Sequence, residues 1–407
     1  MSDTDAALPD ILRHSPVRVV FGMGRLDDLG VLAREEGAHR ILLVSDSGVV
    51  AAGHVERAVA SLHNAGIESR VFADVSVSPT TDEVDAGVRF CQSDAPDFVI
   101  GLGGGSVMDC AKGINLLLSN GGRMTDHRGE GPAAKPMLPM ILIPTTAGTG
   151  SEAQSFALIS DANTHQKMAC GDRRLPPEGG LRPRVVILDP NLTRTLPREV
   201  AATAGIDAIA HAIESAASTR RTDVSRSFSR EAWSRLEGNY LRVSAHPSEP
   251  RTSVRADSTQ PQASVRPNPL DATARAEMLL GAHLAGAAVE YSMLGAAHAC
   301  ANPLTARYGL THGVAVGIML SHVIRFNTAD GSNPYDDLGR TSDELARRVE
   351  QLLSAAGLPR TLSDCGVPRA RLDELSVEAA EQWTAAFNPV PLRPEDAAIL
   401  YAGAFDD

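Results

Sequence analysis

The chain has 407 residues, and its formal net charge at pH 7 is −12. Hydrophobic residues make up 43% of the sequence and charged residues 22%, a composition typical of globular proteins that excludes a collagen-like or largely disordered chain. The acidic balance argues against nucleic acid or an anionic membrane as a partner. No apolar run reaches the roughly 18 residues of a transmembrane helix, so no membrane span is expected.

The cysteines and the first residues of the chain bear on its compartment. The five cysteines are scattered without a CxxC pair, and MSDTDAALPD lacks the charged-then-apolar pattern of a secretory signal. We therefore expect reduced thiols in a cytoplasmic protein. The length predicts two to three domains, with two favoured.

The first half of the chain alternates apolar runs with helical patterns. Strands separated by helices at this spacing predict parallel βαβ units, so residues 1–194 are expected to form an α/β domain with a parallel, Rossmann-like sheet. The predicted strands are 41–46, 70–75, 97–103 and 140–144, with further strands at 155–161 and 185–189, and the predicted helices are 50–66, 80–93 and 106–119.

Alanine-rich helical patterns replace the strands in the second half, so residues 195–407 are expected to form an all-helical domain. The predicted helices are 198–218, 227–243, 270–296, 313–327, 341–356 and 393–405. Residues 244–269 are rich in Ser, Pro, Arg and Thr and nearly lack large apolar side chains, which predicts a mobile surface insertion. Residues 171–184 have a similar composition and are predicted to be a shorter insertion of the same kind.

The sequence GLGGGSVMDCAK, residues 101–112, places glycines between a predicted strand and a predicted helix. Such a turn lets a pyrophosphate approach the backbone, and the helix N-terminus offers free N–H groups and the positive end of the helix dipole. Ser106 stands where the GxGxxG fingerprint has its last glycine, so a tight turn that binds nothing is the alternative.

Two further features lie at strand ends, where open α/β sheets bind ligands. The run IPTTAGTGSEA, residues 143–153, offers Thr145, Thr146 and Thr149 as donors to phosphate or ribose, with a plain turn as the alternative. Asp46 follows the strand ILLVSD and could accept bonds from the adenosine ribose, which would disfavour the 2′-phosphate of NADP. Its alternative is an N-cap of the next helix.

Asp207 and His211 in AGIDAIAHAIES are spaced four residues apart, so both project from one face of a helix. His298 is predicted to close one helix and His312 to open the next. One carboxylate and three imidazoles are a suitable set for Fe²⁺ or Zn²⁺, with open positions for a substrate oxygen. Each histidine alone would more often be an ordinary packed or surface residue, but the set in apolar helical contexts favours a metal site.

With these motifs in order along the chain, the sequence resembles the iron-containing (group III) alcohol dehydrogenase family from about residue 16 to residue 405. The resemblance rests on GGGSVMDCAK, PTTAGTGSE, GIDAIAHAIES and HACANPLTARYGLTHGVAVGIMLSHVIRFN. It implies a dinucleotide-binding domain and a helical domain, with the active site in the cleft between them. It also implies Asp207, His211, His298 and His312 as metal ligands. The implied cofactor contacts are Asp46, Gly104, Gly105, Ser106, Asp109, Thr145, Thr146, Thr149, Lys167 and Leu192.

The chain departs from the family pattern at Asn302, where many members carry a second histidine near the nicotinamide. Asparagine cannot titrate, so Asn302 is a candidate for contact with the substrate or the proton path, and His283 is a candidate replacement for the missing histidine. A second departure is Ser78-Pro79-Thr80, where the family often has Asn-Pro-Thr.

The predicted function is an NAD(H)-dependent, divalent-metal-dependent alcohol dehydrogenase or aldehyde reductase for a small aldehyde or primary alcohol, with a phosphonate aldehyde as one candidate. NAD(H) is favoured over NADP(H), and a homodimer or higher homo-oligomer is expected. The alternatives are a metal-free enzyme similar to maleylacetate reductase and a non-catalytic NAD-binding protein.

Overall fold

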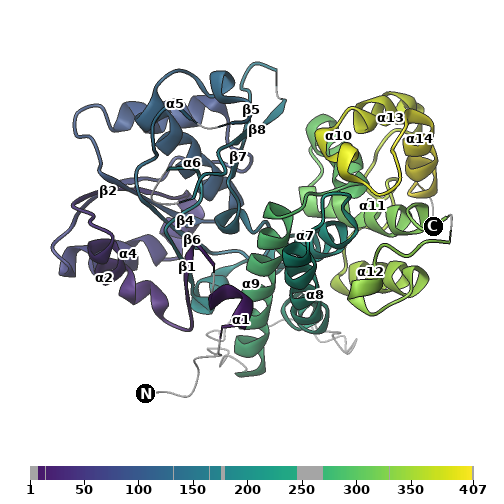
Figure 1. The fold of residues 1–407 in the computed structure, drawn as a ribbon, viewed down its shortest axis with the longest axis horizontal. Helices are drawn as coiled ribbons and strands as arrows, with labels where there is room; N and C mark the ends of the chain where they lie inside the picture. Colours follow the sequence, from purple (N-terminus) through teal and green to yellow (C-terminus); the bar gives the residue numbers. More distant parts are fainter. Residues whose placement is uncertain are drawn as a thin grey trace, which may run out of the picture.

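Two parts of different architecture lie side by side in the computed structural model, an α/β part from the first half of the chain and a helical part from the second (Figure 1). Within the helical part, helices α7 (Arg198–Ala217), α8 (Asp223–Ser244) and α9 (Pro269–Glu290) lie on the side nearest the α/β part. The structure describes residues 8–13, 15–131, 133–164, 166–175, 179–244, 269–329 and 331–405.

The α/β part is built on a six-stranded sheet in the order β1-β9-β6-β4-β2-β3, and every neighbouring pair is parallel. The predicted parallel sheet is therefore confirmed. Crossovers between parallel strands require the intervening helices that the sequence pattern indicates. The strands are β1 (Arg18–Phe21), β2 (Arg40–Val44), β3 (Glu68–Phe72), β4 (Phe98–Gly103), β6 (Met140–Pro144) and β9 (Val185–Leu188).

Helices cover both faces of this sheet. Successive side chains of a strand point to opposite faces, so the apolar strands bury side chains on both. In β2, Leu42 and Val44 join one apolar core, whereas Ile41 and Leu43 join the other. The helices packed on the two faces are α2 (Leu29–Glu35), α3 (Ser47–Ala51) and α4 (His54–Asn64) on one side and α5 (Thr81–Phe90) and α6 (Gly105–Asn120) on the other.

A smaller sheet stands apart from the six-stranded one, with the order β5-β8-β7. Its strands are β5 (Gly129–Glu130), β7 (Phe156–Ser160) and β8 (Lys167–Gly171), and β7 runs antiparallel to β8. The strand predicted at 155–161 therefore exists but does not extend the parallel sheet. The short strands β1 and β8 were not predicted, because four or five residues between polar segments give little periodic signal.

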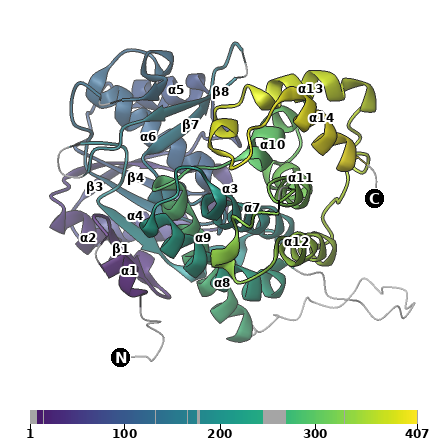
Figure 2. The ribbon, with the colours of Figure 1, turned by 45° about the vertical axis from the view of Figure 1, so that its right-hand side comes forward.

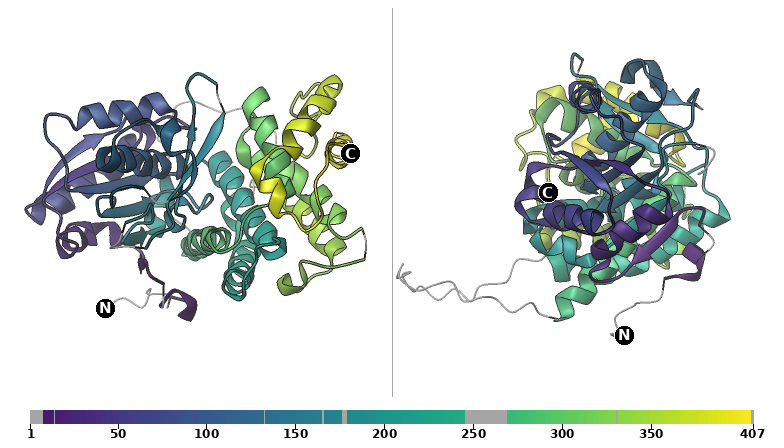
Figure 3. Two further views of the ribbon diagram at one scale, coloured as in Figure 1. Left: turned by 45° about the horizontal axis from the view of Figure 1, so that its top comes forward. Right: turned by 90° about the vertical axis from the view of Figure 1, so that its left-hand side faces the viewer.

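Long apolar helices form the second part, and one continuous core joins them to β1 and β9 of the sheet. Figures 2 and 3 show α7 and α9 lying next to the α/β part. Among the described residues, no helix is both long and apolar enough to cross a membrane. The remaining helices are α1 (Asp10–Arg13), α10 (Ala296–Tyr308), α11 (His312–Phe326), α12 (Ser342–Ala356), α13 (Leu372–Ala380) and α14 (Pro394–Gly403).

Two predicted helices are interrupted. The helix expected at 50–66 is divided between α3 and α4 by Gly53, whose φ of 78° is left-handed. The helix expected at 270–296 ends at Glu290, and α10 begins at Ala296. The prediction that His298 closes a helix was therefore wrong, because His298 lies in the first turn of α10.

Most described residues of segment 171–184 are packed against the protein, so the prediction of a surface insertion was wrong for them. Asp172 is buried and paired with Arg174 at 2.6 Å, and Leu181 belongs to a core of the α/β part. Composition missed this because a buried carboxylate and its arginine partner look like solvated charges in the sequence. The insertion predicted at 244–269 lies almost wholly outside the described residues, and the domain boundary between 194 and 195 stays a prediction.

The two parts meet at a close backbone contact. Gly150, in the loop after β6, and Gly286, in α9, approach so closely that a Cβ on Gly286 would lie 2.4 Å from the carbonyl oxygen of Gly150. Only glycine allows this approach. The contact therefore fixes the loop of the α/β part against a helix of the helical part.

We predict that Gly286→Ala destabilises the protein by about 1–3 kcal/mol, because backbone atoms must shift to admit the methyl group. Gly238→Ala is a matched control, since Gly238 is a helical glycine in α8 with nothing within 4 Å of the added Cβ. That change should stabilise the helix by about 0.5–1 kcal/mol. Melting temperatures of the two variants test the contact, and equal melting temperatures would contradict it.

Candidate metal and nucleotide site

Three helices bring the predicted metal ligands together around one carboxylate oxygen. Asp207 and His211 lie one turn apart on α7, His298 lies in the first turn of α10, and His312 begins α11. The Asp207 Oδ1 atom is 3.4 Å from His298 Nε2, 3.7 Å from His211 Nε2 and 3.8 Å from His312 Nε2. The four predicted residues therefore form one cluster.

The cluster has the features of a cation site. Asp207 Oδ1 and His298 Nε2 are buried without a hydrogen-bond partner among the described residues. Ligand atoms of Asp207, His298 and His312 all lie within 4.8 Å of one another. A buried carboxylate without a partner costs several kcal/mol, which a bound cation would offset. One carboxylate and three imidazoles suit Fe²⁺ or Zn²⁺, so the residues present fit a divalent metal.

Electrostatics support the same conclusion. Burial lowers the pKa of His312 to about 3, and burial also lowers the pKa of His211, so both rings are neutral and their lone pairs are available. For Asp207, burial raises the pKa, but the surrounding histidines outweigh it and hold the pKa below the usual range. Burial likewise opposes protonation of His298, but the carboxylates of Glu214 and Asp207 raise its pKa to about 9. In the metal-free chain these carboxylates favour a proton on His298, which a bound cation would displace.

Glu214 is a functional candidate that the sequence analysis missed. It is buried, and its carboxylate accepts a hydrogen bond from His298 Nδ1 and another from the Ala297 N–H at 2.8 Å. A carboxylate on the second ring nitrogen fixes the tautomer and orientation of a metal-binding histidine. The signal in the sequence was its position, three residues after His211, which places it on the same side of α7.

The glycine turn and the threonine run form a second cluster at the carboxyl ends of the strands. Gly104 and Gly105 begin α6, and an added Cβ on Gly105 would lie 2.6 Å from the Thr149 hydroxyl. An added Cβ on Gly104 would lie 3.4 Å from Thr146. Gly104 has no side chain to cap the first N–H groups of α6, so they are available to an anion. This arrangement fits a pyrophosphate cradle.

Other predicted cofactor residues surround this cradle. The Ser106 hydroxyl accepts a hydrogen bond from the Ser78 N–H at 3.2 Å, and Ser78 has a left-handed φ of 60°. The Thr145 N–H bonds to the backbone at the end of β4, and Asp109 is buried and accepts from the Ser151 hydroxyl at 2.6 Å. Lys167 is exposed at the start of β8, and its charge acts on both Asp109 and His312.

Asp46 and Leu192, two further predicted cofactor residues, also have structural roles. The Asp46 carboxylate accepts from the Val49 N–H at 2.9 Å, so it does cap α3, and any ribose contact would come in addition. The Leu192 side chain is packed in the core under α2 and α4, which leaves only its backbone to reach a ligand.

The proton-path candidates have defined partners. Asn302 lies one turn after His298 on α10, and its Nδ2 donates to Gln382 Oε1 at 3.1 Å. His283 is buried, and its Nδ1 lies 3.1 Å from Glu152 Oε1 in the loop after β6. The His283 ring therefore contacts the loop after β6.

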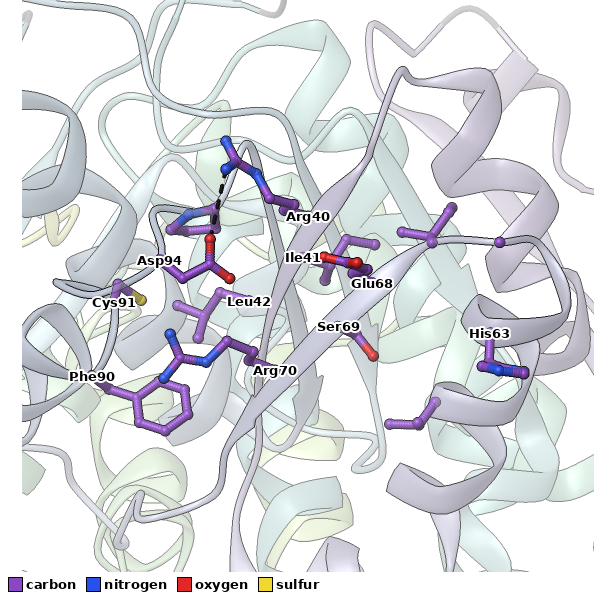
Figure 4. Close-up of a pocket in the computed structure, with 14 residues that line it drawn as sticks. Arg40, Ile41, Leu42, His63, Glu68, Ser69, Arg70, Phe90, Cys91 and Asp94 are labelled. Carbon is purple, nitrogen blue, oxygen red and sulfur yellow. Dashed lines mark ion pairs between the residues drawn. The ribbon is translucent and has the colours of Figure 1, made fainter.

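A cavity of about 610 Å³ lies elsewhere, around the edge strand β3 (Figure 4). Arg40 and Glu68, which line it, are the first residues of β2 and β3, whereas the glycine turn follows the other end of β4. Its charged residues offset one another, as in the Arg40–Asp94 pair at 3.6 Å. This cavity is separate from the candidate site.

Comparison with known proteins identifies the family. A family model described as iron-containing alcohol dehydrogenase matches residues 16–190, and the model of the family's C-terminal part matches residues 260–405. The chain is 30% identical over 422 positions to long-chain-alcohol dehydrogenase 1 of Geobacillus thermodenitrificans, covering 96% of this chain and 97% of that one. It is 30% identical over 402 positions to lactaldehyde reductase of Escherichia coli, covering 95% and 97%.

A solved structure shows the same fold. Sulfoacetaldehyde reductase from Bifidobacterium kashiwanohense, in complex with NAD⁺, superposes with a TM-score of 0.81 at 26% identity, covering 96% of this chain and 97% of that one. The chain therefore belongs to the iron-containing alcohol dehydrogenase family. It is an oxidoreductase that acts on CH–OH groups.

We predict that Glu214→Gln weakens metal binding about 10- to 100-fold, because the amide leaves His298 without its charged partner. The measurement is metal retained per chain after dialysis against a graded chelator. Glu237→Gln is the control, since Glu237 also forms ion pairs, with Arg340 and Arg348, but lies on α8. Equal metal retention in both variants would contradict a role for Glu214.

Proposed function

We propose that the chain is an NAD(H)-dependent, divalent-metal-dependent alcohol dehydrogenase or aldehyde reductase. The main support is the contact between the two candidate clusters. Gly148, in the threonine run, would place an added Cβ 2.7 Å from the Ala204 methyl group on α7, and the His211 ring lies beside the Gly148 backbone. A nucleotide held by this loop would therefore be adjacent to the residues that would hold the metal.

The metal role follows from the donor set. Asp207, His211, His298 and His312 would hold the ion, which supplies Lewis-acid polarisation of the substrate oxygen when bound. The residues of the chain do the rest: Glu214 orients His298, and burial keeps His211 and His312 neutral. The glycine turn and Thr149 would fix the cofactor so that the nicotinamide faces the substrate carbon.

The proposed substrate is a small aldehyde or primary alcohol. Relatives of similar identity are named for long-chain alcohols and for lactaldehyde, and a structural relative for sulfoacetaldehyde, so similarity alone does not choose the substrate. Acetaldehyde, lactaldehyde, sulfoacetaldehyde and phosphonoacetaldehyde form the panel that tests the class. A homodimer or higher homo-oligomer stays a prediction.

A metal-free reductase similar to maleylacetate reductase is less well supported, because such an enzyme has no use for the orphaned Asp207 oxygen among three imidazoles. A non-catalytic NAD-binding protein would bind NADH but oxidise it with no carbonyl of the panel. Asn302 removes a titratable group one turn from His298, so a proton must leave by another route in an active enzyme.

We predict that His298→Ala loses both bound metal and turnover while NADH binding is kept, because His298 lies in the helical part and the glycine turn in the α/β part. Three measurements on one sample decide this: metal per chain by elemental analysis, NADH consumption over the aldehyde panel and NADH affinity by fluorescence. An active enzyme without stoichiometric metal would overturn the proposal.

We predict that Asp46→Asn shifts cofactor preference from NADH toward NADPH. Removing one unfavourable charge contact with the 2′-phosphate is worth roughly 1–3 kcal/mol, about ten- to hundred-fold in relative kcat/KM. Asparagine caps helices as well as aspartate does, so α3 should remain intact and the effect should report charge alone. Equal kcat/KM for NADH and NADPH in the unmodified protein would contradict the assignment.

A further inference from the structure

Lys112 directs a fully buried ammonium at the segment 151–156, which follows the threonine run. Its Nζ donates to the carbonyl oxygens of Ser151 at 2.6 Å, Gln154 at 2.8 Å and Phe156 at 2.7 Å, and it also lies 3.0 Å from Ser151 Oγ. Oxygens in several directions suit a tetrahedral ammonium, whereas a planar guanidinium cannot point at all of them. This explains a lysine in a chain whose 38 basic residues include only three lysines.

Glu290 binds the same segment through the N–H and hydroxyl groups of Ser155. It is the last residue of α9, it is 3% exposed, and it accepts from the Ser155 N–H at 2.9 Å and from the Ser155 hydroxyl at 2.8 Å. Lys112 thus takes the carbonyl oxygens of residues 151, 154 and 156, and Glu290 takes the two donors of Ser155 between them.

One face of α9 contacts this loop at three places. Glu290, Gly286 and His283 are spaced by four and three residues, so they share a face of the helix. His283 contacts Glu152, Gly286 contacts Gly150, and Glu290 contacts Ser155. Because α9 shares its core with α7, this face connects the loop to the helix that carries Asp207 and His211.

The segment in turn holds Thr149, one wall of the candidate pyrophosphate cradle. Gln154 Nε2 donates to the Thr149 carbonyl oxygen at 3.1 Å, and the Ser151 N–H donates to Thr149 Oγ1 at 3.3 Å. The Ser151 hydroxyl also donates to Asp109 of α6 at 2.6 Å. A displacement of the segment would therefore move Thr149 relative to Gly105.

The two buried charges act on each other, although Arg182 also lies 3.8 Å from Glu290. A lone buried ammonium or carboxylate is strongly unfavourable, and a partner of opposite sign with saturated hydrogen bonds offsets the desolvation. Burial lowers the pKa of Lys112, while the charges of Asp109, Glu290 and Glu152 oppose that effect. The loss of either charge leaves the other less compensated.

We propose that Lys112 and Glu290 are positioning residues that clamp segment 151–156 from the two parts of the molecule and so place Thr149 for cofactor binding next to the metal ligands. The inference rests on the proposed NAD(H)-dependent function. It assigns neither residue a contact with substrate or cofactor.

The test measures NADH affinity by fluorescence titration, metal content and melting temperature in full-length variants. Glu290→Gln and Lys112→Met should each raise the Kd for NADH about tenfold, while metal content stays unchanged. A tenfold change corresponds to the free energy of about one charge-assisted hydrogen bond. Lys112→Arg should also raise the Kd for NADH, because a planar guanidinium keeps the charge but cannot donate to all of the oxygens that Lys112 contacts. The double variant should raise the Kd by less than the product of the single effects, since each change removes the other's unpaired charge.

Two further variants keep the test decisive. Ser155→Ala removes the hydroxyl that donates to Glu290 and keeps the Ser155 N–H, so it should raise the Kd mildly even where a lysine variant fails to fold. Glu277→Gln is the matched control on α9, because Glu277 pairs with Arg235 at 2.6 Å and does not contact the segment. It should lower stability and leave NADH affinity unchanged.

The outcomes separate the inference from the function on which it rests. NADH affinity within about twofold of the unmodified chain in folded Glu290→Gln and Ser155→Ala would overturn the inference alone, as would equal effects of Glu277→Gln. If the unmodified chain binds no NADH, the proposed function falls, and the inference falls with it.

Discussion

The buried carboxylate of Asp207 is the constraint on which the arrangement of the helical part depends. Its Oδ1 atom lies within 3.8 Å of three imidazole nitrogens that come from α7, α10 and α11, and it has no hydrogen-bond partner among the described residues. Such a group is tolerated only where a cation compensates it. Three helices must therefore converge with little freedom, and Glu214 adds a second buried carboxylate that fixes His298. Packing and chemistry impose the same geometry here, since the residues on these helices also form the continuous apolar core.

The loop after β6 couples this centre to the parallel sheet. It packs through Gly148 on α7 and through Gly150 on α9, and both contacts exclude even a methyl group. Lys112 and Glu290 hold the following segment through buried, saturated hydrogen bonds. A cofactor held at the glycine turn would thus be positioned relative to the candidate metal ligands without any contact of its own to the helical part. This coupling is a physical reason for building a dehydrogenase from two such parts, because hydride transfer tolerates little error in distance.

Much of this could be predicted from the sequence, because its signals are local. The parallel sheet follows from alternating apolar runs and helical patterns, and the pairing of Asp207 with His211 follows from their spacing on one helix. That His298 and His312 reach the same carboxylate is a tertiary fact, which the apolar helical contexts of the histidines favoured and the resemblance to a family implied. Glu214 was within reach as a neighbour of His211 on the same helix face. The clamp by Lys112 and Glu290 was not, since these residues are far apart in the chain. Composition misled at Asp172 and Leu181, which are buried in a segment that reads as solvated.

The most direct test of the central claim is metal-dependent stability in the unmodified chain and in Asp207→Asn. The chain stripped of metal should gain melting temperature on titration with Fe²⁺ or Zn²⁺ and saturate at one ion per chain, because a ligand that binds only the folded state stabilises it. Stripped Asp207→Asn should show no gain in melting temperature with metal, because the amide lacks the anionic oxygen that a divalent metal binds. A melting temperature that is independent of metal in the unmodified chain, together with full activity, would contradict the account.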